Sequence, residues 1–587
     1  MVLSPFFSSA WIVVVAMQAE LGPKLVPIAL VACCDGDGTI IDRSKAQLSE
    51  LSAAPYPTGP RALVVTINAQ ELIACHLALG WPIPERIVDL LIEFRNVSNG
   101  ALPTMGPTLS GALHWHGLPA SVGLVTGSTP ARLRRQLDAV RQLFHRMTLG
   151  LDLGRALLRG RYMCAVARLE TAGIPIDQAC VGRLAKKWSA FWSSAVGIID
   201  KPHGIFRNGR LDRDALAEWL DHRGIAWPRT GMGALDLGDD AFGDMARAHP
   251  ELRPLKDVQT TISYFDPREL KIGGDGRNRT SLRPFASRTG RNQPSTKASI
   301  LGAPTWARHL IRPEVGTGLA MIDWRQQEFG IAAALADDLA MQASYNTGDP
   351  YLAFAIATGS APPTATVESH AELRDRFKAC ALGVQYGISA ERLARLIMRP
   401  VSHAEELLRR HRSQFRRFWS WLDAVETDAF FSARQASVFG WQLAVDANAN
   451  PRAVRNFPMQ ANGAEMLRLA CCLVTEAGIT VCAPNHDALL IEAPLGELDD
   501  AVATTQRLMA EASSIVLDGF ELRTQVRVCR APDHWLEPRG ATIWSAVERA
   551  LEASSSPAHQ RHATCSETNS RPIYLYVPKE DSDHGTV

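Results

Sequence analysis

Two aspartates are the first residues in this sequence whose placement could do chemistry. In GLAMIDWRQQEFGIAAALADD, an apolar run ends at Asp323 and helix-like spacing follows it. In VCAPNHDALLIEAP, two strand-like runs flank the turn PNHD, which carries Asp487. A carboxylate at a strand end that faces a cleft is a common catalytic placement. Taken singly, each aspartate also has a structural interpretation, as a helix N-cap for Asp323 and as a turn residue for Asp487.

A third segment, RDRFKACALGVQYG, carries a stripe of functional side chains. Arg374, Lys378, Leu382 and Tyr386 recur every four residues, so on an α-helix they share one face. The two cations could meet the phosphates of a nucleotide, while the apolar residue and the phenol meet its sugar and base. The alternative is an amphipathic surface helix in which this spacing arises by chance.

Only a tertiary fold can unite Asp323 and Asp487, which lie 164 residues apart in the chain. From Gly318 onward strand and helix patterns mix, and long basic helices are expected from about Glu368 to Ala433. Residues 371–420 hold eleven Lys and Arg against five Asp and Glu. A near-neutral protein with such a local excess can bind a phosphate backbone, or can simply present a solvated face.

The N-terminal part of the chain has an α/β layout. Three apolar runs predict strands at residues 12–16, 27–32 and 62–67, and helical patterns follow them. The first run is interpreted as a strand rather than a signal peptide, because no Lys or Arg precedes it. Helical periodicity continues over about 157–192, and a polar stretch rich in Gly and Pro occupies roughly 200–300.

Taken in chain order, the three segments resemble motifs A, B and C of family A (DNA polymerase I-like) DNA polymerases. DWRQQEFG stands where the family has D-Y-S-Q-I-E-L-R, and His486-Asp487-Ala488 stands where it has H-D-E. Motif B has Arg, Lys, an aromatic residue and Tyr-Gly at the offsets found here. SRTGRNQPS (287–295) resembles the T-G-R-L-S-S segment, and RAVRNFPMQANGAEMLRLA (452–470) resembles R-x-x-x-N-x-P-x-Q-G-x-A-A-D. Five motifs in the right order are a specific signal.

The resemblance implies an α/β and α+β multidomain fold, namely a right-hand polymerase with palm, fingers and thumb. A ribonuclease H-like exonuclease-type domain is expected before it, and mostly antiparallel palm strands around the two aspartates. The expected domains are a degenerate 3′–5′ exonuclease-like domain at 1–150, the thumb and start of the palm at 151–300, the palm with motif A at 301–345, the fingers with motif B at 346–440, the palm with motif C at 441–552, and a disordered tail at 553–587.

The resemblance also implies a two-metal mechanism of nucleotide addition. Asp323 and Asp487 would be the catalytic residues and would hold two Mg²⁺ ions, for which Mn²⁺ can substitute. The backbone carbonyl of Trp324 would add a ligand. One ion would lower the pKa of the primer 3′-hydroxyl, and the other would support the pyrophosphate leaving group.

Two further sets of residues follow from the same resemblance. Arg374 and Lys378 would bind the triphosphate, Glu328 would exclude the 2′-hydroxyl of ribonucleotides, and Tyr386 would close that pocket. The nucleotide-binding set is Arg374, Lys378, Leu382, Tyr386, Glu328 and Gln326. The residues that would contact primer and template, mainly through the backbone and minor groove, are Arg291, Arg452, Asn456, Gln460 and His486.

The implied function is template-directed DNA polymerisation, with primer–template DNA and deoxynucleoside triphosphates as partners and a monomer as the working form. A cytoplasmic location is expected, because the 11 cysteines show no metal-binding or disulfide pattern. No run of about 18 apolar residues exists, so no membrane span is expected.

Several positions depart from the family pattern. Leu382 stands where Phe or Tyr is usual, and Ala488 replaces the acidic residue after the motif C aspartate. Tyr351, in GDPYLAFA, replaces a histidine that contacts the triphosphate. Arg325 and Gln327 are also unusual within motif A.

The expected exonuclease carboxylates are mostly missing from residues 1–150. The first-strand D-x-E aligns with Ala16 and Gln18, and the Tyr and Asp of the last motif align with Arg132 and Gln136. Asn68 and Asp89 remain from the middle motif. Because two metal ions need about four carboxylates, the sequence predicts a polymerase without proofreading.

Three other functions are alternatives for this sequence. A catalytically inactive relic that binds primer–template DNA would keep the fold and lose activity. A single-subunit RNA polymerase is disfavoured by Glu328. The motif D-x-D-G-T at 35–39 resembles that of haloacid dehalogenase-like phosphatases, with Asp35 as nucleophile and Asp37 as acid/base. The same segment is also interpretable as a Gly-Asp hairpin turn between two strands.

Overall fold

A computed structural model describes residues 7–19, 25–101, 105–119, 129–207, 209–295 and 297–555 of the chain. The chain folds into two compact units. Unit 1 comprises Met1–Gln178, Arg268–Ala303 and Ala307–Leu536, and unit 2 comprises Ala179–Pro267, Pro304–Trp306 and Glu537–Val587. Most of the tail that the sequence predicts to be disordered lies outside the described residues. No helix of the described part is long and apolar enough to cross a membrane.

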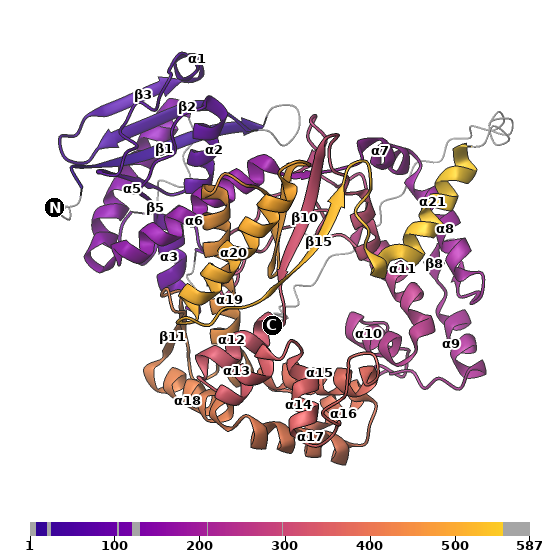
Figure 1. Cartoon of the computed structure of the whole chain (residues 1–587). Helices are drawn as coiled ribbons and strands as arrows, with labels where there is room; N and C mark the ends of the chain where they lie inside the picture. Colours follow the sequence, from indigo (N-terminus) through magenta and orange to yellow (C-terminus); the bar gives the residue numbers. More distant parts are fainter. Residues whose placement is uncertain are drawn as a thin grey trace. The chain divides into compact units, whose positions relative to one another are not determined.

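Unit 1 begins with a five-stranded sheet in the order β3-β2-β1-β4-β5 (Figure 1). Its strands are β1 (Ser9–Ala19), β2 (Leu25–Cys34), β3 (Ile40–Ser44), β4 (Ala62–Thr66) and β5 (Ile87–Asp89). Strands β1, β2 and β3 are antiparallel neighbours, whereas β4 and β5 run parallel to β1. The three strands predicted from apolar runs are therefore confirmed. All five residues of β4 are buried, as expected for a strand covered on both faces.

Polar side chains cap the N-termini of several helices in this region. Asn68 caps α2 (Ala69–Leu79) and Asp89 caps α3 (Leu90–Ser98), each through its side-chain oxygen. Asp152 caps α6 in the same way. The helices are α1 (Lys45–Ser49), α2, α3, α4 (Leu109–Trp115), α5 (Thr129–Met147) and α6 (Leu153–Ala172).

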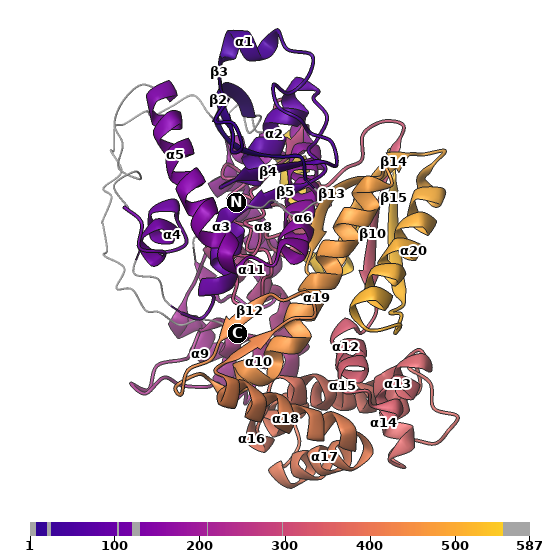
Figure 2. The ribbon, with the colours of Figure 1, turned by 90° about the vertical axis from the view of Figure 1, so that its left-hand side faces the viewer.

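The palm-like sheet of unit 1 has four antiparallel strands in the order β13-β14-β10-β15. They are β10 (Thr317–Trp324), β13 (Thr480–Asn485), β14 (Ala488–Pro494) and β15 (Thr524–Arg530). This confirms the expectation of antiparallel strands around the two aspartates. The long helix α19 (Pro451–Glu476) packs against α6 and β13, and α20 (Leu498–Val516) lies alongside β10 and β14 (Figure 2).

A helical region follows β10, in agreement with the helices predicted from about Glu368 to Ala433. Buried aromatic rings form its core, with Phe354 contacting Phe377, His411 and Phe415. The helices are α12 (Gln327–Leu335), α13 (Leu339–Asn346), α14 (Pro350–Ala357), α15 (Ala371–Gln385), α16 (Ala390–Ile397), α17 (Val401–Gln414) and α18 (Arg416–Ser432). A short hairpin of β11 (Arg434–Ala436) and β12 (Gln442–Ala444) leads on to α19.

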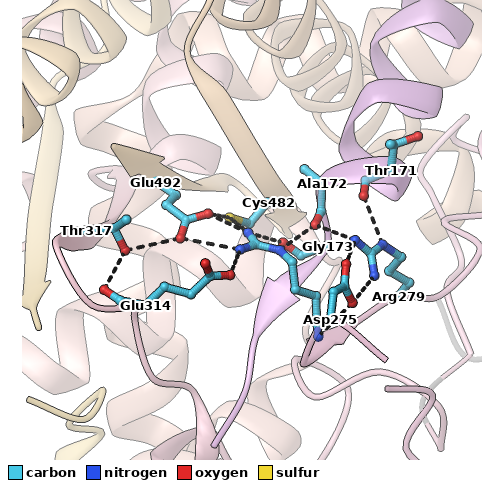
Figure 3. A network of polar contacts seen from close by, with 10 residues as sticks. Thr171, Ala172, Gly173, Asp275, Arg279, Glu314, Thr317, Cys482 and Glu492 are labelled. Carbon is cyan, nitrogen blue, oxygen red and sulfur yellow. Dashed lines mark hydrogen bonds and ion pairs between the residues drawn. The ribbon is translucent and has the colours of Figure 1, made fainter. Parts of the chain in front are cut away.

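A network of arginines fixes the C-terminal end of α6 (Figure 3). The last carbonyls of a helix lack partners within it. Here the guanidinium groups of Arg277 and Arg279 donate to the carbonyls of Thr171, Ala172 and Gly173. Arg277 also pairs with Glu314, before β10, and with Glu492 on β14. The network therefore joins α6 to the palm-like sheet, through β9 (Arg277–Asn278), which pairs with β6 (Ile174–Pro175).

Unit 2 is mainly helical. Its elements are most of α7 (Gln178–Lys186), α8 (Trp188–Asp200), β7 (Phe206–Arg207), β8 (Arg210–Leu211), α9 (Arg213–His222), α10 (Asp239–Ala248), α11 (Arg253–Tyr264) and α21 (Ala541–Ser555). Stacked tryptophans hold it together, since the ring centroids of Trp188, Trp192 and Trp306 lie 5.4–6.3 Å apart.

The two units divide the chain differently from the boundaries expected from sequence. The polar stretch at 200–300 contains three helices, whose apolar residues form a small core of their own. Helix α21 belongs to unit 2, although the sequence assigned residues up to 552 to the palm. Trp544 of α21 stacks on Trp306 at 6.3 Å, and Gly540 passes so close that a Cβ would lie 2.4 Å from the Trp306 backbone.

Candidate active site

Antiparallel pairing brings the two motif aspartates together. Asp323, next to last in β10, lies opposite Ala488 of β14, so it is beside the β13–β14 turn that carries Asp487. The backbone N–H of Trp324 donates to the carbonyl of Asp487 at 3.3 Å. His486 tightens this turn with a φ of 58° in the left-handed region. Asp323 is not the N-cap of α12, because that position is occupied by Gln326.

The electrostatics of this pair suit a cation. Partial burial and the charge of Asp323 raise the pKa of Asp487 well above its ordinary value. The Oδ1 atom of Asp323 is buried and has no hydrogen-bond partner among the described residues. Its Oδ2 atom accepts from Gln525 Nε2 at 3.0 Å. Two close carboxylates with an unused oxygen fit Mg²⁺, which proteins bind through one or two carboxylates together with substrate phosphates.

The described residues contain no cluster of three or more His, Cys, Asp or Glu side chains that could hold a metal by itself. The remaining ligands at the Asp323–Asp487 pair would therefore come from backbone carbonyls, water or a phosphate-bearing substrate.

Three elements meet next to the aspartate pair and place a hydrogen-bonded trio there. Glu328 is in the first turn of α12, Tyr386 is the C-cap of α15, and Gln460 lies in α19. The Tyr386 hydroxyl donates to Glu328 Oε1 at 2.5 Å, and Gln460 Nε2 lies 2.7 Å from the same oxygen and 3.0 Å from the hydroxyl. Partial burial and the Glu328 carboxylate raise the pKa of Tyr386, so its phenol keeps its proton at neutral pH.

The predicted stripe on α15 is present. Arg374, Lys378 and Leu382 lie in this helix at successive turns, and Tyr386 ends it. Arg374 Nε donates to Asp349 Oδ2 at 2.5 Å, while Leu382 is partly buried against the core.

The residues expected to contact primer and template fall into two groups. Arg452, Asn456 and Gln460 lie on one face of α19, at the spacing of i, i+4 and i+8. Asn456 is buried, and its side-chain oxygen has no hydrogen-bond partner among the described residues. Arg291 and His486 line a cavity of about 450 Å³ beside the β13–β14 turn.

Two residues close to this site have no counterpart in the sequence analysis. Gln525 reaches Asp323 from β15, and Asp349 caps α14 and holds Arg374. For Asp349 a signal existed, because Asp-Pro before an apolar run is typical of a helix start. For Gln525 no local signal exists, since the pairing of β10 with β15 depends on the whole sheet.

The D-x-D-G-T segment is a hairpin turn, as the structural alternative predicted. It joins the antiparallel strands β2 and β3. Asp35 accepts from Arg141 Nε at 3.1 Å and lies 2.7 Å from His145 Nε2, both on α5. Asp37 accepts from the backbone N–H of Thr39 at 2.9 Å. Both carboxylates therefore hold structure together, and neither is poised as a nucleophile.

An antiparallel sheet with paired aspartates at one end, flanked by a helical region that carries the cationic stripe, is the architecture of a right-hand polymerase. The family model of "DNA polymerase family A" matches residues 275–536, which contain all of these elements. Over this region, which is 262 of the 587 residues, the chain is similar to DNA polymerase family A.

Curated proteins similar to this chain are DNA polymerases I. A thermostable DNA polymerase I of Thermus thermophilus is 26% identical over 409 residues, covering 64% of this chain and 47% of the relative. A DNA polymerase I of Aquifex aeolicus is 25% identical over 385 residues, or 62% and 64% of the two chains. One from Mycobacterium tuberculosis is 25% identical over 378 residues, or 59% and 41%. The chain thus spans about half of the length of such relatives.

The fold also matches a solved structure. The POL domain of Pol1 from M. smegmatis, in complex with DNA primer-template and dNTP, superposes with a TM-score of 0.69. The match has 20% sequence identity and covers 89% of this chain and 95% of that one. It shows that the chain shares the fold of that POL domain.

Proposed function

We propose that this protein is a template-directed DNA polymerase that adds deoxynucleotides to a primer 3′ end. The observation that carries the proposal is the convergence of Asp323 and Asp487 at one end of the palm-like sheet, beside Glu328, Tyr386 and Gln460. Such a convergence of residues from four separate segments has no structural purpose of its own, because it leaves a carboxylate oxygen unpartnered.

In this proposal Asp323 and Asp487 hold two Mg²⁺ ions, or Mn²⁺ in their place, and the Trp324 carbonyl is a further ligand. The bound ions would activate the primer 3′-hydroxyl and stabilise charge on the leaving pyrophosphate. Gln525 holds one oxygen of Asp323, which orients the carboxylate and leaves the other oxygen available. Burial, and after it repulsion from the Asp323 carboxylate, raises the pKa of Asp487, and a bound cation would relieve that repulsion.

The side chains around the pair would select the nucleotide. Arg374 and Lys378 would bind the triphosphate as charge partners, with Leu382 and Gln326 beside them. Glu328 is held by Tyr386 and Gln460, so its carboxylate cannot easily swing away from the sugar 2′ position. A 2′-hydroxyl would then crowd an anion that already has its hydrogen bonds, and deoxynucleotides would be preferred.

Primer–template DNA would be bound by Arg291, His486 and the polar face of α19, namely Arg452, Asn456 and Gln460. These contacts suit the backbone and minor groove and would not read sequence. We propose a monomer that works in the cytoplasm. The odd count of 11 cysteines, without a C-x-x-C spacing, supports a reducing location.

We further propose that the N-terminal region derives from a 3′–5′ exonuclease and does not proofread. The sheet position expected to supply the first carboxylates carries Ala16 and Gln18, and α5 carries Arg132 and Gln136. Asp89, which remains, accepts backbone N–H groups with both oxygens. Its carboxylate is therefore committed to helix capping.

Primer extension tests the main proposal. Purified protein receives a labelled primer–template, Mg²⁺ and either deoxy- or ribonucleotides, beside Asp323→Ala and Asp487→Ala variants. Extension with deoxynucleotides only, lost in both variants, supports the polymerase and both metal ligands. Salt-sensitive binding of primer–template without extension would instead identify an inactive DNA-binding relic.

End-labelled single-stranded DNA with Mg²⁺ or Mn²⁺ tests the proposed absence of proofreading. We expect the label to stay at full length. Stepwise loss from the 3′ end that persists in the Asp323→Ala protein would show a working exonuclease.

A further inference from the structure

Tyr351 is the side chain near the proposed site whose role is unexplained. It lies in the first turn of α14 and stands where the family resemblance places a triphosphate-contacting histidine. It is 2% exposed, so it cannot offer its ring to solvent or to a nucleotide base. Burial raises the pKa of its hydroxyl, so the phenol is neutral at all pH values at which a polymerase works.

Both cations of the α15 stripe lie over this ring. The Arg374 guanidinium carbon is 5.5 Å from the ring centroid, and the Lys378 ammonium is 5.9 Å from it. Cations within about 6 Å of a ring centroid are attracted by the negative face of the π system. One tyrosine ring thus contacts both of the cations that are proposed to bind the triphosphate.

Another aromatic ring packs against the Tyr351 ring. Phe329 of α12 packs edge-on against Tyr351 at 6.0 Å, and Phe329 in turn packs against Phe415. Phe329 follows Glu328 directly in the sequence, so the residue that anchors the ring adjoins the proposed sugar gate.

Asp349 completes the arrangement from the N-cap of α14. One of its oxygens accepts from the backbone N–H groups of Tyr351 and Leu352, which fixes the start of the helix. The other accepts from Arg374 Nε at 2.5 Å. Arg374 Nη1 contacts Asp375 at 3.2 Å, while Nη2 has no hydrogen-bond partner within the described residues. The guanidinium is therefore held at Nε and Nη1, and Nη2 is the nitrogen left for a ligand.

Lys378 has no carboxylate partner in the described part of the chain, so the Tyr351 ring is its main neighbour of opposite electrostatic sign. A lysine side chain otherwise samples many rotamers and loses their entropy when it binds a ligand. Contact with a rigid aromatic ring reduces that loss.

We propose that Tyr351 is a positioning residue for the nucleotide triphosphate: its ring aims Arg374 and Lys378 at the phosphates in place of a direct contact. This inference rests on the proposed function, because it takes the triphosphate site from it. A tyrosine that replaces a phosphate-binding side chain then supports binding through two others.

The test measures deoxynucleotide affinity at equilibrium, with chemistry blocked. The full-length protein is mixed with Mg²⁺ and a primer–template whose primer ends in a dideoxynucleotide, and binding of the next correct deoxynucleoside triphosphate is titrated. We expect Tyr351→Leu to weaken this binding roughly 10-fold, since two cation–π contacts are lost. Tyr351→Phe keeps the ring and should bind within about twofold of the wild type. Affinity for primer–template should be the same in all three proteins.

Two controls make the result specific. Trp419→Leu removes a comparable contact, with Arg412 at 5.0 Å elsewhere in the helical region, and should leave nucleotide affinity unchanged. Lys378→Ala should cost less affinity in the Tyr351→Leu background than in the wild type, because coupled residues give non-additive effects. Circular dichroism and thermal melting confirm that each variant is folded.

The outcomes separate this inference from the proposed function. Equal affinity in wild type and Tyr351→Leu, or equal losses in the Phe and Leu variants, would overturn the role of the ring. Absence of nucleotide binding in the wild type would overturn it as well. Normal binding with the expected variant pattern, but no extension of an unblocked primer, would support the positioning role and reject polymerase activity.

Discussion

The two sheets of unit 1 use aspartate in opposite ways. In the palm-like sheet, the Oδ1 atom of Asp323 is buried and has no hydrogen-bond partner among the residues that the structure describes. The carboxylate of Asp487 lies beside it. In the N-terminal sheet, Asp89 at the end of β5 has both oxygens engaged. Oδ2 accepts from the Ala69 N–H at 2.8 Å, and Oδ1 accepts from Leu91 and Ile92 at 3.0 and 3.2 Å.

The contrast teaches that a carboxylate is a candidate metal ligand only if its lone pairs are free. Asp89 is fully buried among its partners, and burial raises its pKa to about 6. Asp89 caps α3 and also accepts a hydrogen bond from the start of α2, so its removal should lower the stability of the fold. Asp323 accepts one side-chain hydrogen bond, from Gln525, and its repulsion with Asp487 opposes folding, as is typical of a functional site.

Removing charge from the palm pair should have the largest effect. Asp323→Asn or Asp487→Asn should lower the rate of primer extension by on the order of 10³-fold or more, because several kcal/mol of charge stabilisation are lost. Stability should stay the same or rise, since repulsion between the carboxylates is relieved. Single-turnover extension and urea unfolding, measured on the same samples, check both parts. A marked loss of stability would place these aspartates in the same class as Asp89.

Glu328→Ala tests whether the trio beside the pair selects the sugar. Opening the 2′ position should raise the relative kcat/KM for ribonucleotides roughly 10- to 100-fold. Tyr386→Phe serves as the matched control, because it keeps the ring and loses only the hydroxyl that donates to Glu328. It should have a smaller effect in the same direction. Unchanged sugar selectivity in Glu328→Ala would remove this residue from the gate.

Asp89→Ala tests whether the aspartate of the N-terminal sheet has a structural role. Three backbone N–H groups would lose their acceptor, so unfolding should be easier by about 2–3 kcal/mol. Urea unfolding followed by circular dichroism measures this shift. Primer extension at a temperature where the variant is folded should match the wild type. If the variant is instead as stable as the wild type and has lost a metal-dependent nuclease activity, Asp89 is a ligand and the contrast between the two sheets is wrong.

The smallest effect on stability is expected from the carboxyl group of Glu170, which lies between the two sheets. Glu170 on α6 accepts from the Leu282 N–H at 2.6 Å and from Gln70 on α2, and burial raises its pKa to about 7. A carboxyl whose folded pKa is raised stabilises the fold below its unfolded pKa and loses that contribution as pH rises through about 7.

As the pH rises from about 4.5 to 7, the free energy of unfolding of the wild type should therefore fall by about 1–3 kcal/mol relative to that of Glu170→Gln. Urea unfolding at several pH values gives the difference. A difference between the two proteins that does not change with pH would show that Glu170 remains ionised in the fold.

The sequence predicted the local parts of this molecule well. Hydrophobic periodicity reports local secondary structure. It predicted the strands at residues 12–16, 27–32 and 62–67 and the stripe on α15. The placement of Asp323 at the end of a strand and of Asp487 in a hairpin turn followed from the same patterns. Their proximity came only through resemblance to a family, because residues 164 apart leave no local trace of contact.

What the sequence could not predict depends on pairing across long separations. Gln525 contacts Asp323 only because β15 aligns with β10 in one register, and any other register would move it away. The roles of Asp349 and Tyr351 depend on how α14 packs against α15. Helix α21 was assigned to the palm because it follows it in the chain, whereas its tryptophan packs with Trp306.

The discontinuity of unit 2 has a consequence for how the protein is made. Its main segment, Ala179–Pro267, leaves the ribosome well before Glu537–Ser555, which supplies α21. At 5–20 residues per second, roughly 15–50 s of synthesis separate the two. During that interval the tryptophans of α8 lack the last helix that packs on them. The nascent chain therefore exposes an apolar surface that a chaperone can bind, and truncation before α21 would prolong that exposure indefinitely.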